Sequence, residues 1–201
     1  MTTTTALLTL EEYIAYDDGT DNRYELVDGK LATIPPESDR NNLIALYLLS
    51  EFLKLVPLRL IRHKDTKIVV TGNRTRVRMP DLLVLTEELL AAIGGKRATI
   101  TADMPSPVLV VEVVSPGKAN EDRDYRYKRS EYAARGILEY WIVDYAKRYP
   151  LGPQRDKVTI LSLVDGLYEE TIFENEQTIA SKVIPQFSRT AADVLRVSEN
   201  L

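Results

Sequence analysis

Residues 105–117 have the sequence PSPVLVVEVVSPG, and this stretch sets the fold of the chain. Its centre, residues 107–114, is almost entirely aliphatic and β-branched, a composition typical of a strand that is buried on both faces. Glu112 interrupts the apolar run. A carboxylate buried among apolar side chains loses its hydration, which costs free energy unless a partner, a proton or a metal ion compensates the charge. The stretch therefore predicts a buried acid whose charge is compensated by a partner, a proton or a metal ion.

The segments that follow predict a parallel neighbour for this strand. A polar helix is expected at about 120–135 and ends at Gly136, since glycine favours the end of a helix. The segment ILEYWIVD, residues 137–144, is a second apolar run and predicts another buried strand. A strand, a helix and a strand in this order form a right-handed crossover, in which the two strands pair in parallel.

The rest of the chain adds hairpins and helices. Tight turns, and so two antiparallel hairpins, are predicted at Asp28-Gly29 and Asp165-Gly166. Capping residues and apolar periodicity predict helices at about 10–17, 41–56, 86–93 and 190–196. Two strands are expected around a turn at 71–73, over residues 58–70 and 74–85. Together these elements predict an α/β fold, a mixed β-sheet flanked by helices, in a single domain over residues 1–201.

The composition excludes several classes of protein. The chain has 201 residues, of which 44% are hydrophobic and 28% charged, and is expected to be globular. It contains no cysteine, which excludes disulfide bonds, a thiolate nucleophile and a cysteine-bound zinc ion. The N-terminal residues lack the basic segment and long apolar core of a signal peptide, and no apolar run is long enough to span a bilayer. We therefore expect a cytoplasmic protein without a membrane partner.

Basic residues gather in one part of a chain whose net charge is −4. Residues 54–79 contain eight lysines and arginines and a single acid, Asp65. Two interpretations stay open: a surface that holds phosphates, or the ordinary solvated faces of strands. In the first interpretation, the residues expected to contact nucleic acid are Arg62, Lys64, Arg74, Arg76 and Arg78.

A second acid accompanies Glu112. Asp81 follows Pro80 and begins the apolar segment DLLVL. If the two strands are neighbours, both carboxylates lie near one level of the sheet, where they repel each other unless they share a proton or hold a cation. Carboxylate oxygens suit Mg²⁺ or Mn²⁺, which also accept phosphate oxygens as ligands. The alternative is a buried acid that is hydrogen-bonded or paired with a nearby arginine, and the residues alone leave both open.

Five segments, taken in order, resemble a known family. They are RYELVDGKL, RMPDLLVL, PVLVVEVVSPG, a helix with Lys128 and Tyr132, and GILEYWIVD. Pro80-Asp81, followed about thirty residues later by a strand with Glu112, is similar to the PD-(D/E)XK motif of restriction-endonuclease-like nucleases. The wider pattern, from about Leu10 to the last helix, resembles the bacterial family of endonucleases called Uma-two.

The resemblance implies a restriction-endonuclease-like fold and metal-dependent hydrolysis of phosphodiester bonds. Asp81 and Glu112 match the two acids of the motif, and Glu25 matches an upstream acid that completes the metal site. Strand alternation by itself would leave Glu25 solvated on an ordinary hairpin, so its place at the site rests on the resemblance. Family members often carry a histidine early in the next helix, but this chain has Asn41-Asn42 there and its one histidine is His63.

The lysine of the motif is displaced in this chain. The motif places it two residues after the second acid, where this chain has Val114. The Uma-two pattern has a lysine on the following helix instead, and Lys128 matches it, with Lys118 in the preceding loop as its rival. Asp124, Lys128 and Tyr132 are spaced four apart and lie on one helix face. The alternative is an exposed Asp124–Lys128 pair that contributes little to stability.

These features predict a metal-dependent endonuclease that acts on DNA. The expected catalytic residues are Asp81, Glu112, Lys128 and Glu25, and Mg²⁺ or Mn²⁺ is expected at Asp81, Glu112 and Glu25. The alternative is a catalytically inactive nuclease fold that binds nucleic acid or a protein partner. The hairpins also offer a surface through which two copies of the chain can form a homodimer.

Overall fold

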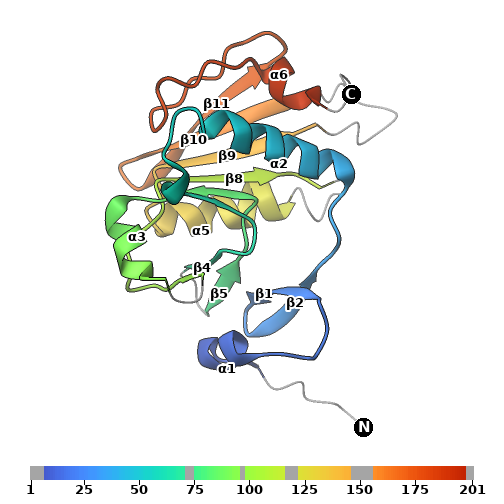
Figure 1. The fold of residues 1–201 in the computed structure, drawn as a ribbon, viewed down its shortest axis with the longest axis vertical. Coiled ribbons are helices and arrows are strands. Elements are labelled where there is room, and N and C mark those ends of the chain that lie inside the picture. The colour runs from blue at the N-terminus through green and yellow to red at the C-terminus, as the bar shows by residue number, and fades with distance from the viewer. Residues whose placement is uncertain (1–6, 71–74, 96–97, 116–121, 146–155, 198–201) are drawn as a thin grey trace.

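The fold is that of a computed structural model, which describes residues 7–70, 75–95, 98–115, 122–145 and 156–197. The described residues form two β-sheets, and helices cover both faces of the larger one (Figure 1). In the larger sheet the strand order is β11-β10-β9-β8-β6-β3. Its strands are β3 (Ile61–His63), β6 (Leu82–Val84), β8 (Leu109–Val113), β9 (Glu139–Asp144), β10 (Lys157–Val164) and β11 (Leu167–Glu174).

The larger sheet is mixed, as expected from the sequence. Strands β8 and β9 pair in parallel, with Leu109 opposite Glu139 and Val113 opposite Val143. The connection between them contains a π-helical segment, η2 (Arg123–Lys128), followed by the helix α5 (Arg129–Ala134). The other neighbouring strands of this sheet, within the described residues, pair antiparallel.

Alternation along β8 separates two cores. Val111 points to one face of the sheet, where it packs with apolar side chains of the helix α2 (Asp39–Phe52), such as Leu48. Val110 points to the opposite face, where it packs with Tyr132 of α5. Figure 1 shows α2 and α5 on opposite sides of this sheet. By the same alternation, Glu112 belongs to the face that α5 covers.

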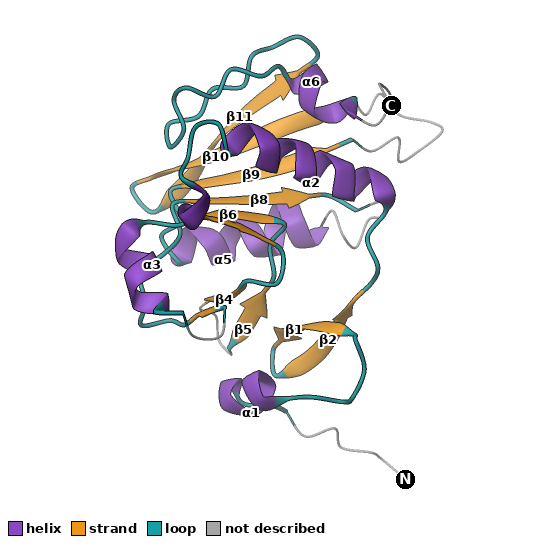
Figure 2. Cartoon of the chain, viewed as in Figure 1, coloured by secondary structure: helices purple, strands orange, loops and turns teal. Residues whose placement is uncertain are grey.

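The smaller sheet is formed by strands from the N-terminal half of the chain. Its strand order is β2-β1-β5-β4-β7, with β1 (Arg23–Val27), β2 (Lys30–Ile34), β4 (Lys67–Val70), β5 (Arg76–Arg78) and β7 (Thr99–Ile100). The predicted hairpin is confirmed, since Val27 pairs with Lys30 and the turn residues Asp28 and Gly29 have φ angles of 53° and 81°. The helix α1 (Leu10–Ala15) lies beside this hairpin (Figure 2).

The region between residues 58 and 85 differs from the expectation of two long strands. It contains the 3₁₀ helix η1 (Leu58–Leu60) and four short strands, of which β3 and β6 belong to the larger sheet and β4 and β5 to the smaller one. Lys64 and Asp65, with φ angles of 52° and 53°, end β3. Pro80, which has no N–H group, lies between β5 and β6. Each predicted strand thus crosses from one sheet to the other.

The helices agree with their capping signals. Ser38 caps α2, and Thr9 with Glu12 forms the capping box of α1. The helices α3 (Glu87–Ile93) and α6 (Ala191–Leu195) also begin after a threonine cap. In the part of the chain that the structure describes, no helix has the length and apolar character needed to cross a membrane.

Candidate active site

The register of β6 and β8 brings the two predicted acids together. Leu83 pairs with Val110 and Leu82 with Val111, so one further step places Asp81 opposite Glu112. The backbone N–H of Val113 donates to Asp81 Oδ2 at 2.7 Å, which fixes the aspartate against the end of β8. Both acids line one pocket of about 280 Å³. The structure therefore gives the two carboxylates the shared position that the sequence predicted.

Glu112 is held by a lysine and a tyrosine. Lys128 Nζ lies 2.8 Å from Glu112 Oε1, and the hydroxyl of Tyr132 donates to the same oxygen at 2.8 Å. Only 5% of Glu112 is exposed. Burial raises the pKa of Glu112 to about 7, although the charge of Lys128 opposes this rise. The charge in the apolar strand is thus compensated in part by the protein itself.

Lys128 points at the acids and away from solvent. Its ammonium group lies between Glu112 and Asp124, whose Oδ1 is 3.1 Å away, and its side chain is 3% exposed. Burial alone would lower the pKa of Lys128, but Asp124 and Glu112 raise it above its ordinary value, so the lysine is a cation. The predicted orientation is confirmed, and the alternative of an exposed Asp124–Lys128 pair is wrong. Its catalytic role stays a prediction.

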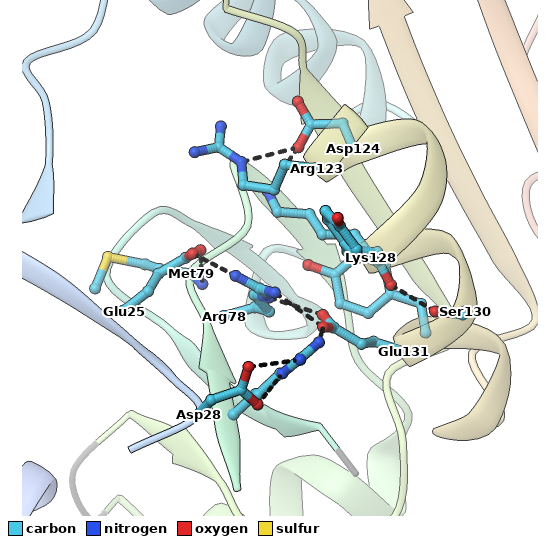
Figure 3. A network of polar contacts seen from close by, with 12 residues as sticks. Glu25, Asp28, Arg78, Met79, Arg123, Asp124, Lys128, Ser130 and Glu131 are labelled. Atoms are coloured by element: carbon cyan, nitrogen blue, oxygen red, sulfur yellow. Dashed lines mark hydrogen bonds and ion pairs between the residues drawn. The ribbon is translucent and has the colours of Figure 1, made fainter. Parts of the chain in front are cut away.

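Lys128 lies where the π-helical segment η2 meets α5. Such π-helical turns are rare and are frequently found at functional sites, because they shift side chains relative to a regular helix. Figure 3 shows Asp124 and Lys128 next to Arg123, whose Nε lies 3.4 Å from Asp124 Oδ1. The side chain of Arg123 is 34% exposed and lines the same pocket. Arg123 is not among the site residues that the sequence predicted.

Asp81 lies in an environment of like charge. Burial raises the pKa of Asp81 well above its ordinary value, and the carboxylates of Glu112 and Glu37 raise it further. Glu37 lines the same pocket as Asp81 and also forms an ion pair with Lys64. Glu37 was not predicted from the sequence, because it lies in the short loop before Ser38 and no motif marks it. The position of Glu37 beside Asp81 depends on where the N-terminus of α2 packs.

Glu25 faces the pocket but is fully engaged. It is 7% exposed, which excludes the solvated position that strand alternation had left open. Its Oε2 accepts a hydrogen bond from Arg78 NH1 at 2.8 Å, and its Oε1 accepts one from the backbone N–H of Met79 at 3.2 Å. Burial would raise the pKa of Glu25, but Lys128 and Arg78 lower it below its ordinary value. Both oxygens therefore have partners other than a metal ion.

Arg78 is a buried residue that lines the pocket, and its expected role as a phosphate contact stays a prediction. Its side chain is 3% exposed and binds Glu131 through Nε at 2.7 Å and NH2 at 2.9 Å, in addition to Glu25. Arg76 binds the same Glu131 at 2.7 Å and pairs with Asp28 at 2.8 Å. The two arginines of β5 thus neutralise acids from β1, the hairpin turn and α5.

The other expected phosphate contacts have local partners as well. Arg62 NH1 donates to the carbonyl oxygens of Arg59 and Ile61, each at 2.8 Å. Lys64 binds Glu37 and Asn42. Arg74, like the rival lysine Lys118, lies outside the described residues. The nucleic-acid roles of Arg62, Lys64, Arg74 and Arg76 stay predictions.

The carboxylates of the pocket suit a hard divalent ion that takes two protein ligands. Among the described residues, no group of three or more histidine, aspartate or glutamate side chains is arranged as a ready-made metal site. Mg²⁺, however, commonly takes one or two carboxylates and completes its shell with water or phosphate oxygens. Asp81 and Glu112 offer two carboxylates at one level of the sheet, and the adjacent Glu37 adds negative charge that favours a cation.

Comparison with known proteins agrees with this architecture. A mixed sheet flanked by helices, with two acids at neighbouring strands, is the arrangement that the resemblance to restriction-endonuclease-like nucleases predicted. The chain belongs to the Uma2 family, described as "Putative restriction endonuclease", whose profile matches residues 10–194. No curated protein matches the chain.

A solved structure has the same fold. It is the crystal structure of a protein described as a putative nuclease belonging to DUF820, from Anabaena variabilis ATCC 29413. The likeness has a TM-score of 0.68 and covers 94% of this chain and 98% of that one, at 14% sequence identity. At this low identity the likeness establishes the fold, and the chemistry has to be argued from the residues of this chain.

Proposed function

We propose that the protein is a metal-dependent endonuclease that hydrolyses phosphodiester bonds of DNA in the pocket of Asp81 and Glu112. The observation that carries this proposal is that the two buried acids, Asp81 just before β6 and Glu112 on β8, line one pocket, with the Lys128 ammonium group against Glu112. Buried acids of like charge that are only partly compensated are costly to fold and are typical of functional sites. The family and the fold support the same reaction class.

Asp81 and Glu112 would hold one Mg²⁺ or Mn²⁺ ion, with Glu37 as a further acid beside Asp81. Glu25 is left out of this ligand set because both of its oxygens are engaged. When bound, the ion supplies a water of lowered pKa and charge for the reacting phosphate.

The side chains of this chain prepare the pocket for an anionic substrate. Lys128 and Tyr132 fix Glu112 Oε1, which leaves the carboxylate in one orientation. The Lys128 ammonium also places a permanent positive charge beside the position where charge develops during phosphoryl transfer. Arg123 lines the same pocket and is partly exposed, so its guanidinium is the group that we assign to a phosphate oxygen of the substrate.

Plasmid cleavage with added Mg²⁺ or Mn²⁺ tests the proposal. Asp81→Asn, which keeps the size of the side chain, is expected to reduce the cleavage rate by about 100-fold or more, the equivalent of ~3 kcal/mol of transition-state stabilisation. Asp165→Asn is the matched control, because this exposed residue lies in the turn between β10 and β11 and asparagine tolerates its φ of 49°. Equal cleavage by both variants would contradict the proposal.

A second candidate is a binding module without turnover. The observation that favours it is that the described residues contain no ready-made group of three metal ligands. Titration with Mn²⁺ by calorimetry separates the two candidates: a nuclease binds the ion in a manner that Asp81→Asn removes, whereas a binding module retains DNA affinity without metal uptake. The expected homodimer stays a prediction.

A further inference from the structure

We propose that a second cavity, next to the carboxylate pocket, receives an unstacked nucleobase of the bound strand. The inference rests on the proposed function, in that the substrate is a nucleic acid. The cavity measures about 240 Å³ and lies between α1, the start of β1 and the start of β4. Its lining combines three tyrosine rings, two cations, one acid, one amide and one thioether, namely Tyr13, Tyr16, Tyr24, Arg23, Lys67, Asp65, Asn22 and Met79.

The tyrosines are fixed before any ligand arrives. Tyr16 and Tyr24 meet edge to face, with ring centroids 5.7 Å apart and an interplanar angle of 89°. The hydroxyl of Tyr24 donates to Asp18 Oδ2 at 2.6 Å, and the hydroxyl of Tyr13 donates to the carbonyl oxygen of Tyr24 at 2.5 Å. Asp18 is itself held in the loop by Thr20, whose backbone N–H and hydroxyl both donate to Asp18 Oδ1.

Tyr16 keeps an accessible ring in this rigid setting. It is 40% exposed, although its neighbour Tyr13 is buried. A fixed aromatic face that is open to solvent is what stacking on a base requires, and every base has such a face. Because the rings are already ordered, stacking of a base on them costs little side-chain conformational entropy.

The cations of the cavity favour a ligand that carries phosphates. Arg23 NH1 lies 3.3 Å from Asp65 Oδ1, and the two side chains are 38% and 78% exposed. Exposed pairs of this kind contribute little, so Arg23 can exchange its partner for a phosphate oxygen at small cost. Lys67 Nζ lies over the ring of Tyr13, 4.5 Å from its centroid. Aromatic faces between cations are the arrangement by which proteins hold single-stranded nucleic acid.

The cavity is next to the proposed reaction centre. Met79 lines both the cavity and the carboxylate pocket. Arg23 and Glu25 are two residues apart on β1, a separation of about 7 Å along the strand. A strand whose phosphate lies over Asp81 and Glu112 can therefore place a neighbouring base against Tyr16. Such a base has to leave its stack, as it does in single strands and in flipped nucleotides.

Fluorescence anisotropy with labelled oligothymidylate, in buffer with EDTA, measures this contact without metal or cleavage. Tyr16→Leu keeps the apolar bulk and removes the ring, and it is expected to raise the Kd about fivefold or more, since one stacked base contributes ~1–3 kcal/mol. Tyr16→Phe is the matched control, because it keeps the ring and should leave the Kd unchanged within about twofold. A thermal melt of each variant confirms folding.

A second probe separates stacking from charge. An abasic oligonucleotide of the same length carries the same phosphates, so the wild type should bind oligothymidylate more tightly than the abasic chain, and Tyr16→Leu should lose most of that preference. If Tyr16→Leu binds both probes like the wild type, or loses affinity for both equally, the base contact is wrong. Plasmid cleavage that persists in that case leaves the proposed function intact, whereas absence of both DNA binding and cleavage contradicts the proposed function itself.

Discussion

The two ends of the pocket contain the same kind of side chain in opposite surroundings. At one end, Glu25 is buried against Arg78, which also binds Glu131 of α5. At the other end, Asp81 faces Glu112 and lies against Glu37. Arg78 and Lys128 help to lower the pKa of Glu25, whereas burial and like charge raise the pKa of Asp81 well above its usual value.

The difference shows which acids stabilise the fold and which are available for chemistry. A buried carboxylate that is paired with an arginine is satisfied, so removal of the arginine leaves an unpaired buried charge. A buried carboxylate that faces another one is frustrated in the free protein and gains from a cation. The pocket thus has a satisfied end, where Arg78 binds Glu25, and a reactive edge, formed by Asp81, Glu112 and Glu37. Three substitutions test this division.

The largest effect on stability is expected at the satisfied end. Arg78→Met leaves Glu25 and Glu131 buried without their shared partner, and should lower the free energy of unfolding by about 3–5 kcal/mol in urea denaturation. Arg76→Met is the control: its side chain is 25% exposed and Glu131 keeps Arg78, so we expect a loss of about 1 kcal/mol. Equal losses in the two variants would show that the network does not depend on Arg78.

Lys128 joins the two ends and should show both effects. Lys128→Met removes the partner of Glu112, while Arg123 still pairs with Asp124, so we expect a loss of about 3 kcal/mol in stability. Cleavage should fall by about 100-fold or more, because the fixed charge beside the reacting phosphate is lost.

The control for this substitution is Lys54→Met, which breaks a lysine–glutamate pair at the surface. Lys54 is 56% exposed and pairs with Glu51, so the expected change is less than about 1 kcal/mol, with cleavage unaffected. A Lys128→Met variant that cleaves plasmid at the wild-type rate would remove the lysine from the mechanism.

The smallest effect on stability is expected at the reactive edge. Since the pKa of Glu112 is raised to about 7, the folded protein binds this proton more tightly than the unfolded chain does. The contribution of this group to stability therefore falls as pH rises from about 4.5 to about 7. Glu112→Gln removes this dependence and, in metal-free buffer at pH 8, should change stability by less than about 1 kcal/mol or raise it, while metal binding is lost.

The matched control is Glu139→Gln on the neighbouring strand β9. Glu139 is equally buried but accepts hydrogen bonds from Trp141 Nε1, Ser181 Oγ and the backbone N–H groups of Lys182 and Val183. Its amide would leave donors unsatisfied, at a cost of about 1–3 kcal/mol. If Glu112→Gln destabilises the protein as much as Glu139→Gln, Glu112 is a structural acid and the metal proposal loses its basis.

Much of the fold follows from local sequence. Hairpin turns at Asp28-Gly29 and Asp165-Gly166, the cap at Ser38 and the parallel partner of β8 were all predicted, because turns, caps and long apolar strands are set by neighbouring residues. The strands between residues 58 and 85 were predicted as two instead of four. A local apolar pattern does not show which sheet a strand joins.

For the site, the sequence by itself determined the two acids and the direction of the lysine. Asp81 and Glu112 interrupt or border apolar strands, and the resemblance to the Uma-two family selected them together with Lys128, which shares a helix face with Tyr132. Only the tertiary structure decided the partners of the remaining charges. It joined Glu37 to Asp81 and enclosed Arg78 between Glu25 and Glu131, contacts between residues far apart in the chain. Whether a charge is neutralised or left reactive depends on which elements pack together, and no local pattern contains that information.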